Sequence, residues 1–486
     1  MNNNFTYSND NKRYHTLNYF YQQKFNSKVF KVSLNANFSC PHKINGKGCI
    51  FCSKSGSGDF AGNINEDLKT QFENVKDVIS KKWPNSKYIA YFQANTNTYA
   101  PLHVLKEKYE EVLKYDNVVG LSIATRSDSI TDEVLDYLTE LNKKTFLTIE
   151  LGLQSAKEET LKYINRGHDL KSFEDMVKKL KMRNINTVVH IINGLPNETK
   201  EDMLNTITYL DKLKIDGLKI HMLYISKDTE LENIYNKEKF HLLTKKEYVD
   251  IVCDQLELLS PDIVINRITG DPVAEDLIEP NWLLKKFTVL NEIDKELVRR
   301  DTHQGFKKSI LNYVRKEIDN HVKKTDYVVD ATFGNGNDTL YLCERAKYVF
   351  GFDIQNDAFQ NAKKLLKDKY DNHVLMLLSH SEMYEKLKDY RNKISLVLFN
   401  LGYLPKGNKN ITTNSDTTIK AIDDSLKMLN NNGKIILTIY PGHESGLKES
   451  IAILNYLKDN KIKYTEFHNT DNIEAPYLIT IKKVDN

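Results

Sequence analysis

The sequence predicts an α/β protein with two domains, an incomplete parallel β/α barrel followed by a doubly wound sheet. Three observations predict it. The chain has 486 residues, enough for more than one domain at about 150 residues each. Apolar, β-branched runs alternate with amphipathic helical segments along most of it, and two strand-like runs separated by a short loop close the sequence. We expect the first domain over residues 1–305 and the second over 306–486.

The strands of the first domain are predicted from six apolar runs, at 29–38, 88–93, 118–126, 145–155, 185–196 and 217–226. Helical patterns separate them. In 170–183 the apolar stripe consists of Phe173, Met176, Val177 and Leu180, at helical spacing. Near-continuous apolar strands that alternate with helices are typical of a parallel sheet covered by helices. Six such units favour an incomplete barrel over a short open sheet.

Seven further runs predict the second sheet, at 326–336, 348–355, 373–380, 394–405, 433–442, 463–469 and 477–484. Helical patterns intervene between the first five. The loop between the last two runs, about seven residues, permits a hairpin and is too short for a helical crossover. This is a doubly wound arrangement with one antiparallel strand. Residues 300–325 have a helical pattern, which we expect to join the two domains directly.

The composition excludes several classes of protein. Hydrophobic residues make up 40% and charged residues 28%, as in a globular chain and unlike a disordered or fibrous one. The 69 Lys and Arg against 66 Asp and Glu leave a net charge of +3, so no overall field demands nucleic-acid or membrane binding, although a local basic groove remains open. The polar N-terminus, and the lack of any apolar run near the roughly 18 residues of a membrane helix, predict a cytoplasmic protein without membrane or DNA partners.

Three of the five cysteines lie close together in the sequence. Cys40, Cys49 and Cys52 form the pattern C-x8-C-x2-C after the first predicted strand, whereas Cys253 falls in a helical pattern and is expected to be a small core residue. Three thiolates can hold a soft metal or a cluster. A structural zinc site needs four ligands, and His42 lies nearby at a spacing unusual for zinc. The triplet favours a 4Fe–4S cluster with one open iron over zinc, with unpaired structural cysteines as a third interpretation.

Several motifs accompany the triplet at predicted strand ends: YFQANTNTYAPL (91–102), ATRSDSI (124–130), ELGLQSAKEETLKYINRGH (150–168), HIINGLPNET (190–199) and TGDPVAEDLIEPNW (269–282). With them, residues 12–307 resemble the YtqA-like branch of the radical S-adenosylmethionine (SAM) superfamily, which is related to the Elongator catalytic subunit. The resemblance implies a partial (β/α)6 barrel whose cluster is held by the three cysteines and binds the amino and carboxylate groups of SAM. It also implies hydrogen abstraction by a deoxyadenosyl radical and an electron donor such as flavodoxin or ferredoxin.

Polar residues at the expected strand ends are candidates for the SAM site, because an α/β barrel binds ligands at its carboxyl mouth. They are Gln93, Arg126, Glu150, Gln154 and His190. We assign Gln93 and Glu150 to SAM, and Arg126 to SAM or to an anionic group of the substrate. The alternatives are structural, namely an ion pair for Glu150 and a hydrogen-bonded core position for His190.

A glycine-containing turn, DATFGNGND (330–338), follows the first strand of the second domain. Gly334 and Gly336 would let the backbone approach a ligand at a helix N-terminus, and Asp353 ends the next strand, where a carboxylate can bind ribose hydroxyls. NAD and SAM both satisfy this pattern. The lack of a third glycine and the terminal hairpin favour a Rossmann-like class I methyltransferase, in which Ser379 and His380, after the third strand, would contact adenine.

The fourth strand of this domain ends in NLGYLP, which contains Asn400 and Tyr403. An Asn three residues before an aromatic residue resembles the N-P-P-Y segment of amino-group methyltransferases, although Leu-Gly replaces the prolines. The resemblance implies catalytic roles for both residues. The Asn400 oxygen would accept a hydrogen bond from the target amine, and the Tyr403 ring would stack on its base. The alternative is a strand end at which Tyr403 covers the core.

Residues 307–486 resemble the YtqB-like (MnmM) methyltransferases almost end to end, through DATFGNGNDTL, FDIQ, FNLGYLPKG and TIYPGHESGLKE. In this resemblance Asp330 supports the glycine loop, and His443 either contacts substrate or caps the following helix. The SAM contacts that it implies are Asn335, Asn337, Asp353, Gln355, Ser379 and His380.

Two SAM-dependent domains in one chain suggest consecutive steps on one substrate. The two resemblances imply a bifunctional enzyme of the tRNA wobble uridine. The first, MnmL-like domain would convert 5-carboxymethylaminomethyl(-2-thio)uridine to 5-aminomethyl(-2-thio)uridine, and the second would methylate the exposed amine. The alternatives are the same chemistry on another RNA, a protein or a small metabolite, and a non-catalytic iron–sulfur or RNA-binding module.

A tRNA substrate would present its anticodon loop, which is single-stranded. Such a loop is held by stacking and by phosphate contacts. The basic residues that we expect to take part are Lys24, Lys28, Lys31, Lys323 and Lys324.

Overall fold

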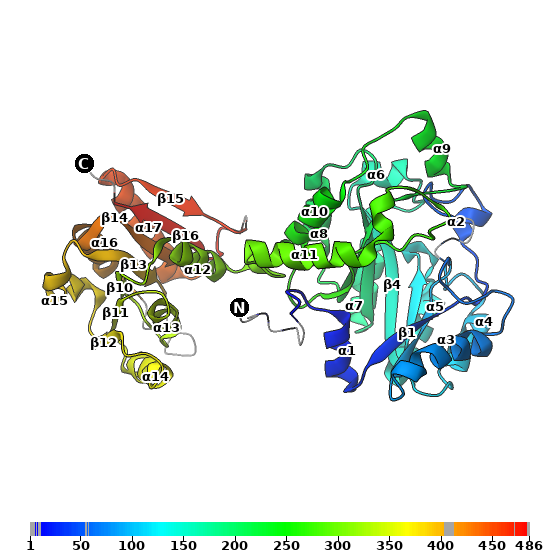
Figure 1. Cartoon of the computed structure of the whole chain (residues 1–486), viewed down its shortest axis with the longest axis horizontal. Coiled ribbons are helices and arrows are strands. Elements are labelled where there is room, and N and C mark those ends of the chain that lie inside the picture. Colours follow the sequence, from blue (N-terminus) through cyan, green and yellow to red (C-terminus); the bar gives the residue numbers. More distant parts are fainter. Residues whose placement is uncertain are drawn as a thin grey trace. The chain divides into compact units, whose positions relative to one another are not determined.

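A computed structural model describes residues 5, 7, 11–53, 56, 58–402, 413–470 and 472–483. The chain divides into two compact units, residues 1–306 and 307–486, and each is described by itself. Figure 1 labels their elements. Within the described ranges, no helix is both long enough and apolar enough to cross a lipid bilayer.

The first unit is built on a seven-stranded sheet in the order β1-β2-β3-β4-β5-β6-β8. Every pairing in it is parallel, and neighbours in space are neighbours in sequence, as in a barrel that remains open. The edge strand β8, which has four residues, was not predicted from the sequence. A short antiparallel pair, β7 and β9, lies apart from this sheet. The bounds are β1 Val29–Leu34, β2 Lys87–Phe92, β3 Val118–Thr125, β4 Phe146–Gln154, β5 Asn186–Asn193, β6 Gly217–Met222, β7 Ile225–Ser226, β8 Val264–Arg267 and β9 Leu277–Glu279.

Helices alternate with these strands, and side-chain caps fix where several of them begin. Thr131, Asp169 and Thr244 each accept a hydrogen bond from a backbone N–H in the first turn of α5, α7 and α10. The predicted apolar stripe of α7 is buried, and Cys253 lies in the main core, as expected. The bounds are α1 Leu17–Phe25, α2 Pro41–Ile44, α3 Leu68–Lys82, α4 Leu102–Val112, α5 Asp132–Lys144, α6 Glu158–Tyr163, α7 Leu170–Met182, α8 Lys200–Lys212, α9 Glu230–Lys237, α10 Lys245–Leu258 and α11 Lys286–Arg300.

The second unit contains a seven-stranded sheet in the order β12-β11-β10-β13-β14-β16-β15. β16 runs antiparallel to both β14 and β15, and the other pairings are parallel, which confirms the predicted doubly wound sheet with a terminal hairpin. The strand order reverses between β10 and β13, where open α/β sheets bind ligands. The bounds are β10 Tyr327–Asp330, β11 Tyr348–Asp353, β12 His373–Leu377, β13 Ile394–Asn400, β14 Leu429–Ile439, β15 Tyr464–Phe467 and β16 Tyr477–Lys482.

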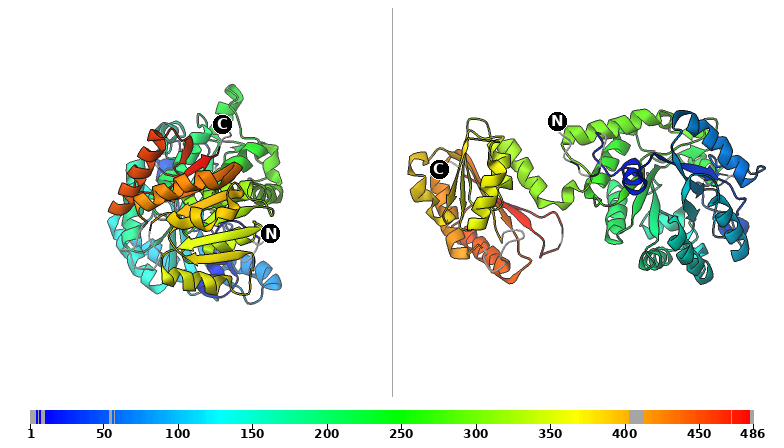
Figure 2. Two further views of the ribbon diagram at one scale, coloured as in Figure 1. Left: turned by 90° about the vertical axis from the view of Figure 1, so that its left-hand side faces the viewer. Right: turned by 90° about the horizontal axis from the view of Figure 1, so that it is seen from below.

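Helices cover both faces of the second sheet (Figure 2). One apolar core packs α15, α16 and α17 against one face, and another packs α12, α13 and α14 against the other. The central strands are therefore buried on both sides, which explains their near-continuous apolar sequences, whereas the edge strands β12 and β15 are partly exposed. The bounds are α12 Ile310–His321, α13 Asn337–Cys343, α14 Asn356–Leu366, α15 Met383–Lys386, α16 Ser415–Met428 and α17 Glu444–Asp459.

The helical pattern predicted across 300–325 is confirmed over residues 310–321, but the residues before them form a turn that separates two helices. α11 ends at Arg300, Asp301 adopts the left-handed conformation (φ +50°) that terminates it, and α12 begins at Ile310. Gly305 also has a positive φ of +76°, and a Cβ there would lie 2.7 Å from the ring of Pro261. A side chain at this position would therefore force the turn away from the first unit's core.

Candidate active sites

A cavity of about 390 Å³ opens at the carboxyl ends of the first unit's strands. Gln93 and Arg126 lie directly after β2 and β3, and Gln154 ends β4, as predicted. Glu150 and His190 lie further back, inside β4 and β5, so the cavity extends from the barrel mouth into its interior. Its lining includes every residue that the sequence predicted for this site: Cys40, Cys49, Cys52, Gln93, Arg126, Glu150, Gln154 and His190.

The three thiols are partly exposed at one end of this cavity. Burial raises the pKa of Cys49, while the guanidinium groups of Arg166 and Arg126 oppose that increase. Burial also raises the pKa of Cys52, to about 11. Within the part of the chain that the structure describes, no three Cys, His, Asp or Glu side chains converge where one metal ion would bind. An iron–sulfur cluster ligates each thiolate at a separate iron, so its ligands need not converge on one point.

Two arginines stand beside the thiols, one predicted and one missed. Arg126 binds Asp128 through two hydrogen bonds of 2.7 and 2.9 Å, and its Nη1 donates to the carbonyl of Arg166 over 3.0 Å. Arg166 is 4% exposed, and its Nε finds no hydrogen-bond partner among the described residues. Arg166 therefore offers an unused donor at the thiol end of the cavity. The sequence feature that could have identified Arg166 is its position in NRGH, the end of the motif at residues 150–168.

Glu150 is the centre of a buried polar network. Burial by itself would raise the pKa of this carboxyl group, but Lys219 and Lys31 outweigh it, and the pKa lies well below its usual value. Glu150 therefore forms ion pairs with both lysines, which is the structural alternative that the sequence left open for it. A role of Glu150 in binding SAM stays a prediction. Its two oxygens lie 2.5–2.9 Å from donor atoms of Lys31, Tyr91, Ser122, His190 and Lys219.

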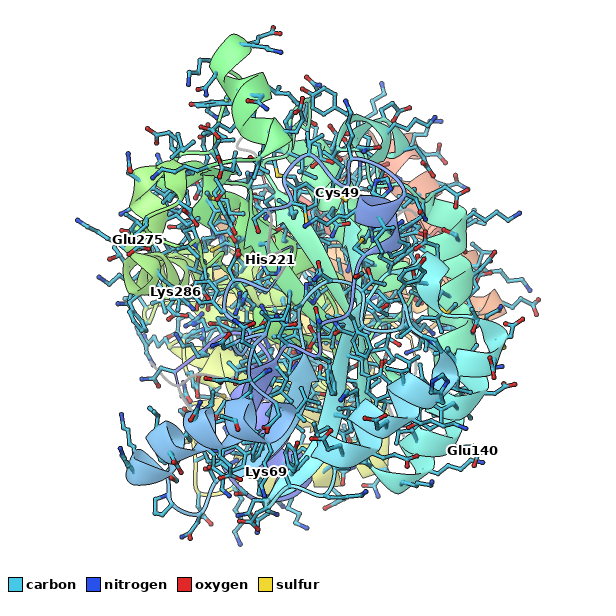
Figure 3. All side chains as sticks on the ribbon, turned by 90° about the vertical axis from the view of Figure 1, so that its right-hand side faces the viewer. Cys49, Lys69, Glu140, His221, Glu275 and Lys286 are labelled. Carbon is cyan, nitrogen blue, oxygen red and sulfur yellow. The ribbon has the colours of Figure 1, made fainter. Side chains whose placement is uncertain are left out.

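β6 contributes two cavity residues that the sequence analysis missed, Lys219 and His221. Burial lowers the pKa of Lys219 to about 7, an effect that Glu150 opposes. Burial also holds the pKa of His221 well below its usual value. In Figure 3, His221 lies near the centre of the view and Cys49 lies above it. A Lys-x-His pair inside the apolar run GLKIHM was the available signal, because alternate residues of a strand share one face.

The structure corrects the interpretation of Lys31 as a phosphate contact. Its ammonium group points into the cavity and pairs with Glu150 at 2.5 Å, and its side chain is 13% exposed. Lys24, Lys323 and Lys324 are exposed, as a phosphate contact requires. Lys28 is half-buried and lies 5.7 Å from the Trp83 ring.

A larger cavity, of about 960 Å³, lies in the second unit where its strand order reverses. Asp330 and Gly336 lie behind its wall. Tyr403 falls outside the described residues. The other predicted residues of this unit all line the cavity: Gly334, Asn335, Asn337, Asp353, Gln355, Ser379, His380 and Asn400.

The glycine loop is held by two carboxylates, of which Asp330 is buried and Asp353 is half-buried. Asp330 accepts hydrogen bonds from the Thr339 hydroxyl (2.6 Å) and the Thr332 N–H (3.3 Å), and burial raises its pKa to about 7. Asp353 accepts hydrogen bonds from the N–H groups of residues 334 and 355, over 3.0 and 2.9 Å. Gly336 has a φ of +87°, and a Cβ there would lie 2.8 Å from the Cα of Ala362 in α14. This glycine therefore lets α13 begin directly against α14.

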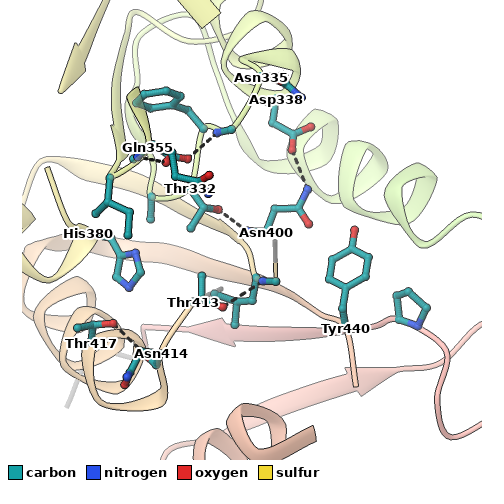
Figure 4. Close-up of a pocket in the computed structure, with 18 of the residues that line it drawn as sticks. Thr332, Asn335, Asp338, Gln355, His380, Asn400, Thr413, Asn414, Thr417 and Tyr440 are labelled. Carbon is teal, nitrogen blue, oxygen red and sulfur yellow. Dashed lines mark hydrogen bonds between the residues drawn. The ribbon is translucent and has the colours of Figure 1, made fainter. Parts of the chain in front are cut away.

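Asn400 is held by two hydrogen bonds, one from its backbone and one from its side chain (Figure 4). Its backbone N–H donates to the Thr332 hydroxyl over 2.7 Å, and its side-chain Nδ2 donates to Asp338 Oδ2 over 3.2 Å. The amide oxygen is the remaining acceptor of this side chain. The Tyr440 ring lies beside Asn400, and burial raises the pKa of its hydroxyl to about 12. Asp338 stood in the glycine motif without an assigned role, and Tyr440 was missed.

Two histidines that line this cavity, His380 and His443, have different hydrogen-bond environments. Burial lowers the pKa of His380 to about 4, and its Nε2 finds no partner among the described residues, so a neutral ring faces the cavity. His443 caps α17, since its Nδ1 accepts a hydrogen bond from the N–H of Gly446 over 3.0 Å. It also lines the cavity, so the capping role does not exclude contact with a ligand.

Three family models match the chain. "Radical SAM superfamily" matches residues 38–210, "Radical_SAM C-terminal domain" matches 215–299, and "Putative rRNA methylase" matches 349–482. The Bacillus subtilis protein YtqA is 49% identical over 308 residues, which span 63% of this chain and 96% of that protein. The chain belongs to the YtqA family of radical SAM proteins.

Two further relatives extend this finding. The Methanocaldococcus jannaschii protein MJ0486 is 39% identical to this YtqA-family chain over 292 residues, 58% of the chain and 89% of that protein. The Arabidopsis thaliana protein named "tRNA (mnm(5)s(2)U34)-methyltransferase, chloroplastic" is 39% identical over 141 residues, 26% of the chain and 51% of that protein. This YtqA-family member is therefore an enzyme with a radical SAM domain and a methyltransferase domain.

The residues of the YtqA-family chain fit the cofactors that its families imply. Three soft thiol ligands around one cavity suit a 4Fe–4S cluster with an open iron, and four-ligand zinc is not matched by this donor set. The second cavity combines a glycine loop, a carboxylate after the next strand and a volume within the usual range of small-molecule sites, which suits SAM.

Proposed function

We propose that this enzyme makes 5-methylaminomethyl(-2-thio)uridine at the tRNA wobble position in two steps. The first unit converts the 5-carboxymethylaminomethyl group to 5-aminomethyl, and the second unit methylates the released amine. The observation that carries the proposal is the presence, in one chain, of a thiol-lined barrel cavity and a methyltransferase cavity. The tRNA methyltransferase named among the relatives supports the second step.

In the first step, the carboxymethyl CH2 would lose a hydrogen atom and then an electron, and water would hydrolyse the oxidised carbon–nitrogen bond. The oxidised form of the electron donor would take up that electron, so that SAM, cleaved to methionine and 5′-deoxyadenosine, is the net two-electron oxidant. The products are the aminomethyl group and a two-carbon oxo acid. When bound, the cluster and SAM supply the hydrogen abstraction and need an electron donor such as flavodoxin or ferredoxin. Cys40, Cys49 and Cys52 would hold the cluster, and Gln93 and the Arg166 Nε would hold SAM beside it.

In the second step, the amine attacks the methyl group of SAM in line. The amine must be neutral to attack, and a buried site disfavours its ammonium form. The Asn400 oxygen would accept a hydrogen bond from the amine and so aim the nitrogen lone pair at the methyl group. Asn335, Asn337, Asp353, Gln355, Ser379 and His380 would bind SAM, and Tyr403 would stack on the base.

The anticodon loop is the part of the tRNA that must reach both cavities. Single-stranded loops can present one base to a cavity while their phosphates stay at the surface. The exposed residues Lys24, Lys323 and Lys324 remain the candidates for phosphate contacts.

The test is turnover of defined RNA by anaerobically prepared enzyme with reductant and SAM. Anticodon stem-loops that carry carboxymethylaminomethyluridine or aminomethyluridine would be supplied separately, and their nucleosides identified by mass spectrometry. We expect both to become methylaminomethyluridine, the first with release of the two-carbon acid. Methylation of the aminomethyl RNA without any conversion of the carboxymethylaminomethyl RNA would overturn the first step and leave the second standing.

A further inference from the structure

The cavity of the first unit carries an imbalance of charge. Among the described residues that line it, five are Lys or Arg and one is a carboxylate, Glu150. A buried cation is costly unless an anion compensates it. Asp128 pairs with Arg126 and Asp271 with Arg267 from outside the lining, whereas Lys31 and Lys219 share Glu150. The cationic residues are Lys31, Arg126, Arg166, Lys219 and Arg267.

These cations form two groups at different places in the cavity. Arg126 and Arg166 act on the thiol of Cys49 and lie at the thiol end. Lys31 and Lys219 bind the two oxygens of Glu150, one each, at 2.5 Å. Arg267 on β8 is the register partner of Lys219 on the neighbouring strand β6, so it belongs with the lysines. We call Lys31, Lys219 and Arg267 the lysine end.

The lysine end retains hydrogen-bond donors that Glu150 does not use. An ammonium group has three N–H donors. Lys31 donates two of them, to Glu150 and Ser122, and Lys219 donates two, to Glu150 and Tyr91. One donor of each lysine therefore remains for a ligand. His221 lies on the same strand as Lys219, and its Nε2 also has no hydrogen-bond partner among the described residues. Polar groups at this end of the cavity can therefore bind a ligand.

We propose that the lysine end binds the carboxylate of the carboxymethylaminomethyl arm and so selects the substrate of the first step. This assignment rests on the proposed function. The arm ends in a carboxylate on a short chain from one base, which can enter a cavity of about 390 Å³, whereas an RNA phosphate belongs to a backbone that stays outside it. Two ammonium groups and a guanidinium would meet the carboxylate with charge-assisted hydrogen bonds.

The same charges favour release of the product. Loss of the carboxylate leaves an aminomethyl group, which carries a positive charge in water. The lysine end attracts the substrate arm and repels this ammonium, so the product leaves the first cavity for methylation. Substrate selection and product release thus follow from one set of residues.

The test measures discrimination between a carboxylate and its neutral isostere. The probes are two anticodon stem-loops that differ at one group, carboxymethylaminomethyluridine and its carbamoylmethyl amide, and their affinities for the full-length, cluster-loaded enzyme are measured by fluorescence anisotropy. We expect the wild type to prefer the carboxylate by at least about ten-fold, the range for hydrogen bonds to a charged group. Lys219→Met and Arg267→Gln should reduce that preference to within about two-fold, since each removes such a donor.

A matched control separates this effect from a general loss of charge. Lys286 binds Asp271 at 2.7 Å, as Arg267 binds it at 3.3 Å, but Lys286 does not line the cavity. Lys286→Met should keep both the preference and turnover. The iron content of each variant shows whether its site is intact, and Arg267, whose side chain is 34% exposed, gives a variant that tests the proposal if Lys219→Met does not fold.

The outcomes distinguish the site from the reaction. If the wild type converts the carboxymethylaminomethyl RNA and Lys219→Met and Arg267→Gln keep the full preference, the carboxylate site is wrong and the reaction stands. If the wild type does not convert this RNA but its preference depends on Lys219 and Arg267, the reaction is wrong and the site stands. A wild type that shows neither conversion nor preference overturns both.

Discussion

Asn400 Nδ2 donates a hydrogen bond to Asp338 Oδ2 over 3.2 Å, and this contact decides which end of the Asn400 amide remains for a ligand. An ionised carboxylate accepts hydrogen bonds and donates none, so the nitrogen must face Asp338 and the oxygen is left as the acceptor. The contact links the glycine loop to the end of β13, two segments that the sequence separates by 62 positions. Asp338 is thus a positioning residue for the proposed methyl transfer.

Asp338→Asn should therefore reduce the rate of methylation by about 10- to 100-fold, because a small misplacement of the Asn400 oxygen would misalign the amine and the methyl group. An amide at position 338 can donate as well as accept, so Asn400 can turn its nitrogen toward the amine. The measurement is kcat/KM with aminomethyl RNA, with SAM affinity determined alongside. Asp319→Asn, which changes a carboxylate outside the cavity, is the matched control. Equal rates for wild type and Asp338→Asn would contradict the positioning role.

Substitutions in the two units should separate the two steps. Cys49→Ala removes a proposed cluster ligand and should abolish conversion of carboxymethylaminomethyl RNA while methylation of aminomethyl RNA continues. Asp353→Ala releases the N–H groups of residues 334 and 355 and should abolish methylation, so that aminomethyluridine accumulates. Nucleoside mass spectrometry reads both outcomes.

Cys253→Ala serves as the control for this pair, because its thiol lies in the core and lines neither cavity. It should keep both steps. Loss of both steps in Cys49→Ala at normal stability would mean that the two cavities do not act independently.

Asp330 should contribute stability to the second unit at acidic pH and lose that contribution as pH rises. Burial raises the pKa of Asp330 from 3.8 to about 7 in the folded protein. Between these values this carboxyl group binds more protons in the folded state than in the unfolded state, so its contribution to the free energy of unfolding falls as pH rises from about 4 to about 7. His380, whose pKa burial lowers to about 4, contributes in the opposite direction over much of this range. The full effect of Asp330 is roughly 4 kcal/mol, since one pKa unit corresponds to about 1.4 kcal/mol.

Asp330→Asn should remove this contribution, because an amide stays neutral at every pH, so the free energy of unfolding of the variant should fall less, or rise more, with pH than that of the wild type. The measurement is urea unfolding followed by circular dichroism from pH 4 to pH 8. Both tryptophans, Trp83 and Trp282, belong to the first unit, so tryptophan fluorescence reports the unfolding of that unit alone. A transition that circular dichroism shows and fluorescence does not is therefore the unfolding of the second unit. Asp416→Asn, on the exposed start of α16, is the control. An unchanged slope in Asp330→Asn would assign the pH dependence to other groups.

Periodicity and local motifs made much of this fold predictable. Apolar runs located thirteen of the strands that form the two large sheets, because strands buried on both faces have few polar residues. β8 was missed although β10 is equally short, because β10 leads directly into the glycine motif that marked its end. The helix predicted within 300–325 begins only at Ile310, because Asp301 and Gly305 adopt left-handed conformations that only the structure reveals.

The candidate sites were predictable to different degrees. Residues in dense motifs, such as the cysteines and the glycine loop, do come together around cavities. Lys31 and Lys219 belong to strands whose order in the sheet had to be known before their contact could be inferred. Lys31 therefore looked like a surface residue, although it reaches Glu150 from three strands away in the sheet order. Contacts between distant strands depend on topology and register, which a single sequence does not encode locally.

The pairing of Glu150 with two lysines should dominate the stability of the first unit. Glu150→Ala leaves Lys31 and Lys219 buried without their carboxylate and should lower the free energy of unfolding by about 3–5 kcal/mol. In the double variant Glu150→Ala/Lys219→Met one of the two uncompensated charges is gone, so its loss should be smaller than the sum of the two single losses. Urea unfolding followed by tryptophan fluorescence, in the absence of the cluster, measures each value for this unit. Strictly additive losses would show that Glu150 and Lys219 are not energetically coupled, and would leave Lys31 as the partner that stabilises the carboxylate.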